Sequence, residues 1–231
     1  VTGAAGIKVT ELANAVRDFS DVAVAIELAD ANGAAGAVGL DVANGASITV
    51  AAAVGQTLTL DIDDDVAAND ILDGSVSLAL GVNTTSAIIL DTTANDDIIS
   101  TLNLSATVAQ SALNVQAGNG NADIVVTGSA NMTFGGNSTA EALNASASTG
   151  VITATTATNL DNITTGSGND VISYVTAAAD VVTGAGNDAI TVGGSLVMAA
   201  GGSIVAGDGT DTLTVAGTSA VTLTVDTAAD T

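Results

Sequence analysis

Three nine-residue blocks with one shared pattern constrain the fold of this chain more than any other feature. They are residues 165–173 (TGSGNDVIS), 183–191 (TGAGNDAIT) and 206–214 (AGDGTDTLT). All three fit x-G-x-G-x-D-x-U-x, where U is a large aliphatic residue. Residues 118–126 are similar, with one extra residue before Asp123. A period of this kind predicts a coil built from repeated turns and short strands.

The phase of the blocks indicates how the coil is built. Ile163, Ile172, Val181 and Ile190 recur with the period of the nonapeptide, and the blocks that begin at 165 and 183 lie two nonapeptides apart. Each nonapeptide is therefore expected to form one turn and one short strand, with its U side chain pointing inward. Two nonapeptides complete one circuit, so every second turn lies directly above the one before it.

The turns combine two chemical properties. A pair of glycines permits left-handed backbone and lets carbonyl groups face inward. The Asp that follows adds a carboxylate, and calcium takes 6–8 oxygen ligands. We expect Asp170 and Asp188 to share an ion between superposed turns. Asp211 follows Asp188 by one circuit plus five residues, and it joins the same stack if the extra five bulge out. A set of Gly- and Asn-rich turns without metal is the alternative.

These blocks resemble the glycine- and aspartate-rich nonapeptide (RTX) repeats of secreted calcium-binding β-rolls. The resemblance implies export by type I secretion and folding on external calcium. It makes Asp170, Asp188 and Asp211 side-chain ligands. The turn glycines that it implies as carbonyl donors are Gly166, Gly168, Gly184, Gly186, Gly207 and Gly209. Further candidate ligands are Asp123, Asp161, Asp180 and Asp208.

The chain also departs from the family pattern. Thr165, Thr183 and Ala206 stand where the family has a leading glycine. The intervening blocks lack the turn glycines. We therefore expect calcium on one side of the roll and none on the other. The close match covers residues 156–214.

The charge balance supports a hard cation. There are 25 acidic residues and 2 basic ones, and no Lys, Arg or His follows Arg17. Carboxylates without basic partners must repel one another or bind cations, and oxygen ligands alone select calcium or magnesium. A merely solvated acidic surface is the alternative. A nucleic-acid partner is excluded because no basic patch exists to meet phosphate.

A second acidic cluster contains Asp61, Asp63 and Asp65. Its spacing begins like a helix–loop–helix calcium loop, but Val66 and Leu72 stand where that loop needs Gly and an acid. A calcium site and a solvated loop both remain open for this cluster.

The composition predicts an all-β chain. Aromatic residues make up 1%, which indicates a thin core of small aliphatic side chains. Alternating runs predict strands at 47–50, 57–62, 76–80, 87–90 and 102–108. We expect a helical junction over residues 1–21, with a helix from Thr10 to Phe19. A β-rich sandwich or irregular solenoid follows over 22–114, and a calcium-binding parallel β-roll over 115–231.

The function expected from these features is structural. Without His or Cys, no constellation for acid–base or nucleophilic catalysis exists, so an enzyme is not expected. No apolar run is long enough to predict a membrane span. The start at Val1 without a signal pattern suggests a mature product or an excerpt of a longer protein.

By resemblance, the chain is expected to be a secreted surface-layer (S-layer) protein that self-assembles on a bacterial cell, with envelope polysaccharide as a further partner. A module of a large adhesin and the secretion domain of an exported hydrolase are the alternatives.

Overall fold

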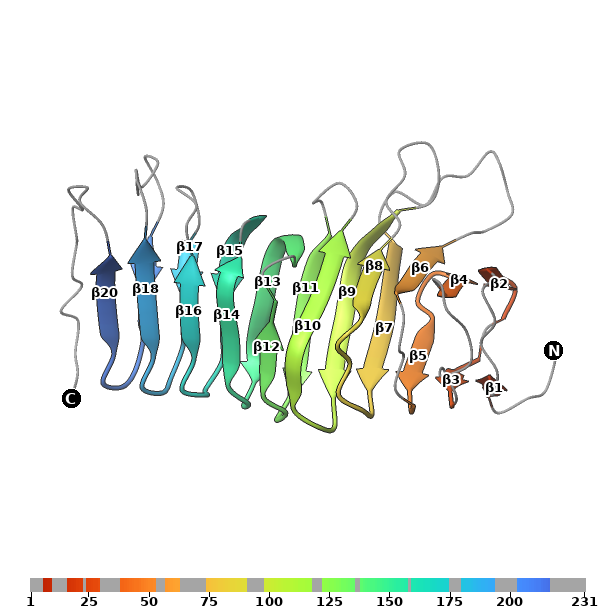
Figure 1. The fold of residues 1–231 in the computed structure, drawn as a ribbon, viewed down its shortest axis with the longest axis horizontal. Helices are drawn as coiled ribbons and strands as arrows, with labels where there is room; N and C mark the ends of the chain where they lie inside the picture. Colours follow the sequence, from red (N-terminus) through yellow and green to blue (C-terminus); the bar gives the residue numbers. More distant parts are fainter. Residues whose placement is uncertain are drawn as a thin grey trace.

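The protein is an all-β parallel solenoid (Figure 1). The structure, a computed structural model, describes residues 6–9, 16–22, 24–29, 38–52, 57–62, 74–90, 98–117, 122–135, 138–157, 159–174, 180–193 and 203–216. These ranges contain strands and turns and no helix, and thus no helix long and apolar enough to cross a membrane.

The strands form two parallel ladders, and each strand pairs with the strand two places on. The odd-numbered ladder consists of β1 (Ile7–Val9), β3 (Ile26–Leu28), β5 (Ser47–Val50), β7 (Gly74–Leu80), β9 (Ile99–Ala106), β11 (Asp123–Gly128), β13 (Thr139–Ser148), β15 (Asn159–Thr164), β17 (Asp180–Val182) and β19 (Ile204–Val205). The even-numbered ladder consists of β2 (Val16–Phe19), β4 (Val38–Val42), β6 (Leu58–Ile62), β8 (Ala87–Leu90), β10 (Gln110–Ala117), β12 (Met132–Phe134), β14 (Ile152–Ala157), β16 (Val171–Tyr174), β18 (Ala189–Gly193) and β20 (Thr212–Ala216). Each coil thus contributes one strand to each ladder.

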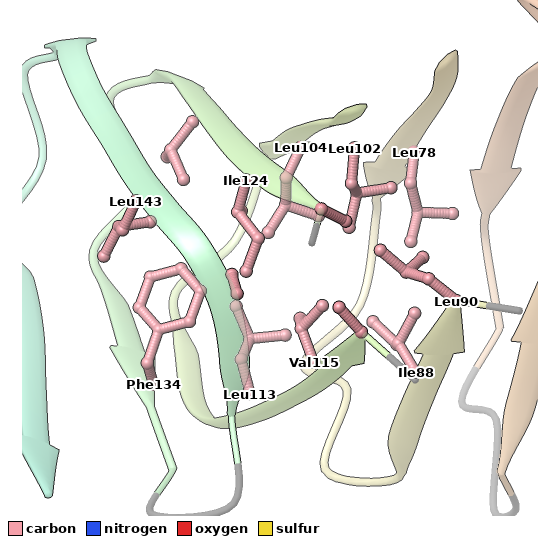
Figure 2. Packing of buried hydrophobic residues seen from close by; sticks show 14 of the residues in the cluster. Leu78, Ile88, Leu90, Leu102, Leu104, Leu113, Val115, Ile124, Phe134 and Leu143 are labelled. Atoms are coloured by element: carbon pink, nitrogen blue, oxygen red, sulfur yellow. The ribbon is translucent and has the colours of Figure 1, made fainter. Parts of the chain in front are cut away.

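The core lies between the two ladders. Figure 2 shows Leu78, Leu102 and Ile124 from odd strands facing Ile88 and Leu113 from even strands. All five are buried. Side chains alternate between the core and the outer face, as in the inward–outward alternation over β4, β6 and β7. The thin aliphatic core expected from the composition is therefore present.

The predicted two-nonapeptide circuit is confirmed. Val171 pairs with Ala189, and Asn162 pairs with Asp180, so each partner lies two nonapeptides further along the chain. Ile163 and Val181, which recur with the same period, are buried in the core. The next step of this ladder is longer, because Ala189 pairs with Thr212, and the inserted residues fall between β18 and β19.

One expectation for the N-terminal part needs correction. Val16–Phe19 is not helical, because it forms β2 and pairs with β4. So short a segment has too few apolar residues for their spacing to decide between helix and strand. Phe19 packs against the core. The rest of that predicted helix, residues 10–15, lies outside the described residues. Of the two architectures expected for the β-rich region, a sandwich and an irregular solenoid, the structure has the solenoid, since the strands of this region continue the same two ladders. β10 also spans residue 115, the proposed boundary, and pairs with β8 and β12.

Candidate metal centre

The three repeat turns stack on one edge of the solenoid. Residues 165–170 join β15 to β16, residues 183–188 join β17 to β18, and residues 206–211 join β19 to β20. All three connect an odd strand to the following even strand, so the parallel ladders place them in one column. The backbones touch directly: Ala185 N donates to Gly166 O at 2.8 Å, and Asp208 N donates to Gly184 O at 2.9 Å.

Glycine is required in this column by close approach as well as by dihedral angle. Gly184 and Gly207 have φ of 83°. A Cβ at Gly184 would collide with the carbonyl oxygen of Gly166, and one at Gly207 would collide with that of Gly184. Gly166 and Gly168, in the first turn, are not among the glycines with positive φ, but a Cβ on either would also meet backbone oxygen of the preceding coil.

The Asp side chains form a ladder along the column. Asp170 Oδ1 accepts a hydrogen bond from Ile152 N at 2.7 Å, and Asp188 Oδ1 accepts one from Asp170 N at 2.7 Å. Asp211 Oδ1 accepts one from Asp188 N at 2.9 Å. Each carboxylate therefore binds the backbone of the coil before it, and Asp211 continues the stack across the longer step between the second and third turns.

Two atoms of this ladder have no partner. Asp170 and Asp188 are only 1% and 2% exposed. Among the described residues, their Oδ2 atoms are the only buried side-chain nitrogen or oxygen atoms without a hydrogen-bond partner. Leaving a buried carboxylate oxygen unpaired is costly, so each such atom calls for a proton, a water molecule or a cation.

The environment of Asp170 opposes its charge. Burial raises the pKa of Asp170 above its ordinary value, and the charge of Asp188 adds to the rise. The N–H of Ile152 and the nearby hydroxyl of Thr165 act in the opposite direction. The Thr165 hydroxyl donates its proton to Thr183 O at 2.9 Å, so it does not satisfy Oδ2 of Asp170. The net result is that burial makes ionisation of the Asp170 carboxyl group energetically unfavourable.

Two further side-chain ladders flank the aspartates, and the sequence analysis did not assign them. Thr183 Oγ1 donates to Ala206 O at 2.9 Å, repeating the bond made by Thr165. Asn169 Oδ1 accepts from Asn187 N, and Asn187 Oδ1 accepts from Thr210 N, both at 2.8 Å. The recurrence of Thr and Asn at the first and fifth places of the first two blocks was the available signal.

The remaining predicted aspartate ligands are not part of the buried Asp ladder. Asp123 and Asp180 begin odd strands, so they lie at the edge opposite the turn column, and Asp180 Oδ1 accepts from Ser203 N at 2.8 Å. The fourth block, around Asp123, therefore belongs to the other edge. Asp208 lies exposed in the third turn, and Asp61 lies on β6 opposite Asp41. Asp63, Asp65 and the side chain of Asp161 lie outside the described residues.

The donor set suits a hard cation in part. It offers two unpartnered carboxylate oxygens and glycine carbonyls in an oxygen-only column, which are ligands that calcium accepts. Against this, the described residues contain no group of three or more acidic side chains close enough to hold a metal. Gly166 O and Gly184 O already accept backbone N–H groups. Any ion held here would depend on Asp170, Asp188 and backbone or solvent oxygens.

Comparison of the chain with protein-family models, with curated proteins and with solved structures found no match.

Proposed function

We propose that the protein is a structural, calcium-stabilised β-solenoid that is secreted to a bacterial cell surface and assembles there with copies of itself. The main support for this proposal is the position of the two buried carboxylate oxygens that have no hydrogen-bond partner. Both belong to Asp170 and Asp188, the residues whose spacing predicted shared calcium ligands. A calcium ion at Oδ2 would neutralise carboxylates that otherwise stack in the turn column.

The charge of the chain supports the same role. A net charge of −23 with two basic residues leaves nearly every carboxylate without a basic counterpart. Among the described residues, one salt bridge is present, between Lys8 and Glu27 at 3.0 Å, and it is exposed. External divalent ions are the natural counter-charge for such a chain. The secreted, surface-layer assignment rests on the resemblance of the repeats.

A calcium titration of the full chain tests the proposal. Far-UV circular dichroism would follow the melting temperature and light scattering the mass, with reversal by EGTA. At a calcium concentration 100 times the Kd, one site contributes about 2.7 kcal/mol to the free energy of unfolding. We expect a higher melting temperature and larger particles in calcium. A melting temperature equal in calcium and EGTA would contradict the proposal.

Matched variants localise the effect. The Asp170→Asn/Asp188→Asn double variant should lose the calcium-dependent rise in melting temperature. Glu141→Gln, which removes one exposed charge on β13, should keep it. A calcium-stabilised protein that remains monomeric would favour an adhesin module or the secretion domain of a hydrolase over a surface layer.

A further inference from the structure

The described strands of the even-numbered ladder carry no charge from β8 onward, whereas β2, β4 and β6 of the same ladder contain Arg17, Asp18, Asp41 and Asp61. β8, β10, β12, β14, β16, β18 and β20 contain no Asp, Glu, Lys or Arg. We call the outward side chains of these seven strands the neutral face. The charged residues of the other strands are Lys8, Arg17, Asp18, Glu27, Asp41, Asp61, Asp123, Glu141, Asp161 and Asp180.

The neutral face presents columns of small side chains. Thr155, Ser173, Thr191 and Thr214 pair in register along β14, β16, β18 and β20. A second column two residues earlier contains Thr133, Thr153, Val171, Ala189 and Thr212. Figure 1 shows β14, β16, β18 and β20 as one row in a common direction. All of the side chains in both columns are partly or fully exposed, and Val171 is 37% exposed.

Charge decides which partner such a face fits. Two copies of a chain with net charge −23 repel each other wherever acidic surfaces meet. The neutral face is the longest run of uncharged strands in either ladder, since the odd-numbered ladder has such a run only over β5, β7 and β9. It therefore gives two copies the broadest surface of the described strands on which to approach without opposing carboxylates. Like-charge contacts elsewhere would also disfavour other orientations. A two-fold axis would bring the same face of both copies together.

The area of the neutral face suits a weak, reversible contact. Seven strands spaced about 4.8 Å apart give a length of about 30 Å, and five residues per strand give a width of about 16 Å. The face then covers about 480 Å² on each copy, or about 960 Å² in total, which is in the range of weak, reversible interfaces below about 1,200 Å². Small Thr, Ser, Ala and Val side chains also permit two sheets to stack closely.

We propose that two copies of the chain pair face to face through the neutral face. This inference rests on the self-assembly proposed above and names the surface that carries it. Methyl groups of Thr, Ala and Val supply the apolar contact, and the Thr and Ser hydroxyls supply hydrogen bonds across the interface.

Sedimentation velocity of the full chain in calcium, over a range of concentrations, tests the pairing. Wild-type protein should sediment as a dimer or larger multiple of dimers at high concentration. Thr155→Asp/Thr191→Asp should raise the Kd of pairing at least about 100-fold, because it places carboxylates opposite one another in a dry contact. Thr127→Asp/Thr164→Asp adds the same charge to the outer face of the odd ladder and should change the Kd less than about 3-fold. Circular dichroism establishes that both variants fold.

The outcomes separate this inference from the proposed function. Assembly of the Thr155→Asp/Thr191→Asp variant as strong as that of wild type would overturn the face and leave self-assembly standing. Wild-type protein that stays monomeric would overturn the pairing. This holds even if envelope polysaccharide is found to bind to the threonines of the neutral face. The calcium-dependent rise in melting temperature is read separately, and its absence counts against the proposed calcium function whatever the mass.

Discussion

The coils of β5–β8 and those of β14–β18 are stabilised by different means. In the first region, the coils are long, with Ser47 paired to Ser77, and β6 and β7 bury an apolar residue at every second position. In the second, the coils shorten to two nonapeptides, with Val171 paired to Ala189, and Ile172 is the one buried aliphatic residue of β16. The long coils rely on apolar burial, whereas the short coils add polar ladders in their turns.

Magnitudes explain why the short coils need their turns. A fully buried Leu, Ile or Val contributes about 1.5–3 kcal/mol. Each net hydrogen bond of the Asp, Thr and Asn ladders contributes about 1 kcal/mol. Several such bonds per turn offset the loss of one or two aliphatic side chains per strand. The regular repeat therefore marks the part of the solenoid in which turn chemistry replaces core volume.

The largest expected effect comes from filling the turn column. Gly184→Ala should lower the free energy of unfolding by more than about 4 kcal/mol or unfold the last coils. The new Cβ would collide with the Gly166 carbonyl oxygen, and the alanine would have to adopt an unfavourable positive φ. Gly45→Ala is the matched control, since Gly45 has φ of 78° and open space around the Cβ position. Gly45→Ala should lower the free energy of unfolding by about 1–2 kcal/mol. Urea unfolding measures both, and equal losses would show that the turns do not stack closely.

Core truncation in the long-coil region should rank second. Leu60 is fully buried and pairs with Leu40 and Leu90, so Leu60→Ala should cost about 2–5 kcal/mol. Thr59→Ala, on the outer face of the same strand, should change the free energy of unfolding by less than about 0.5 kcal/mol. The comparison between the two regions fails if Leu60→Ala is as mild as Thr59→Ala.

Removing one buried charge should have a smaller, calcium-dependent effect. In EGTA, Asp188→Asn should melt at the wild-type temperature or above it, because it keeps an acceptor oxygen and removes an ionised group. In saturating calcium, the variant should lack the wild-type gain of about 2–3 kcal/mol. Differential scanning calorimetry in both buffers measures the two quantities. A variant that kept the whole calcium gain would exclude Asp188 as a ligand.

The smallest expected effect is a pH dependence of Asp170 in EGTA. Burial raises its pKa, so the folded chain binds this proton more tightly than the unfolded chain does. This contribution to stability is present at low pH and is lost as the pH rises through the folded-state pKa. As the pH rises from the ordinary pKa of 3.8 toward the raised pKa of the folded state, wild type should therefore lose stability relative to Asp170→Asn. Parallel pH profiles for the two proteins would contradict the burial argument.

The sequence predicted the regular part of the fold, residues 156–214, because the period is explicit there. The recurrence of Ile163, Ile172 and Val181 implied both the two-nonapeptide step and the inward side chains, and the glycines located the turn column. The predicted strands 47–50 and 87–90 match β5 and β8. In the long coils the step varies, since Val38 pairs with Leu58 but Ser47 pairs with Ser77. No single period therefore linked those strands into ladders.

What was missed depends on contacts between distant coils. The strand β2 gains its partner from β4, which no local pattern around Val16–Phe19 reveals. The edge on which a turn lies depends on whether it follows an odd or an even strand, so the Asp123 block could not be separated from the others. The neutral face can be recognised only when the even-numbered strands from β8 to β20 are known to lie in one ladder.

The central claim is that the stacked Asp turns hold calcium at their buried, unpartnered oxygens. A high-resolution crystal structure grown in calcium tests it most directly. The account predicts density heavier than water about 2.3–2.6 Å from Oδ2 of Asp170 and Oδ2 of Asp188, with further oxygen ligands around it. Crystals in saturating calcium that show only water or no density beside both oxygens would contradict it.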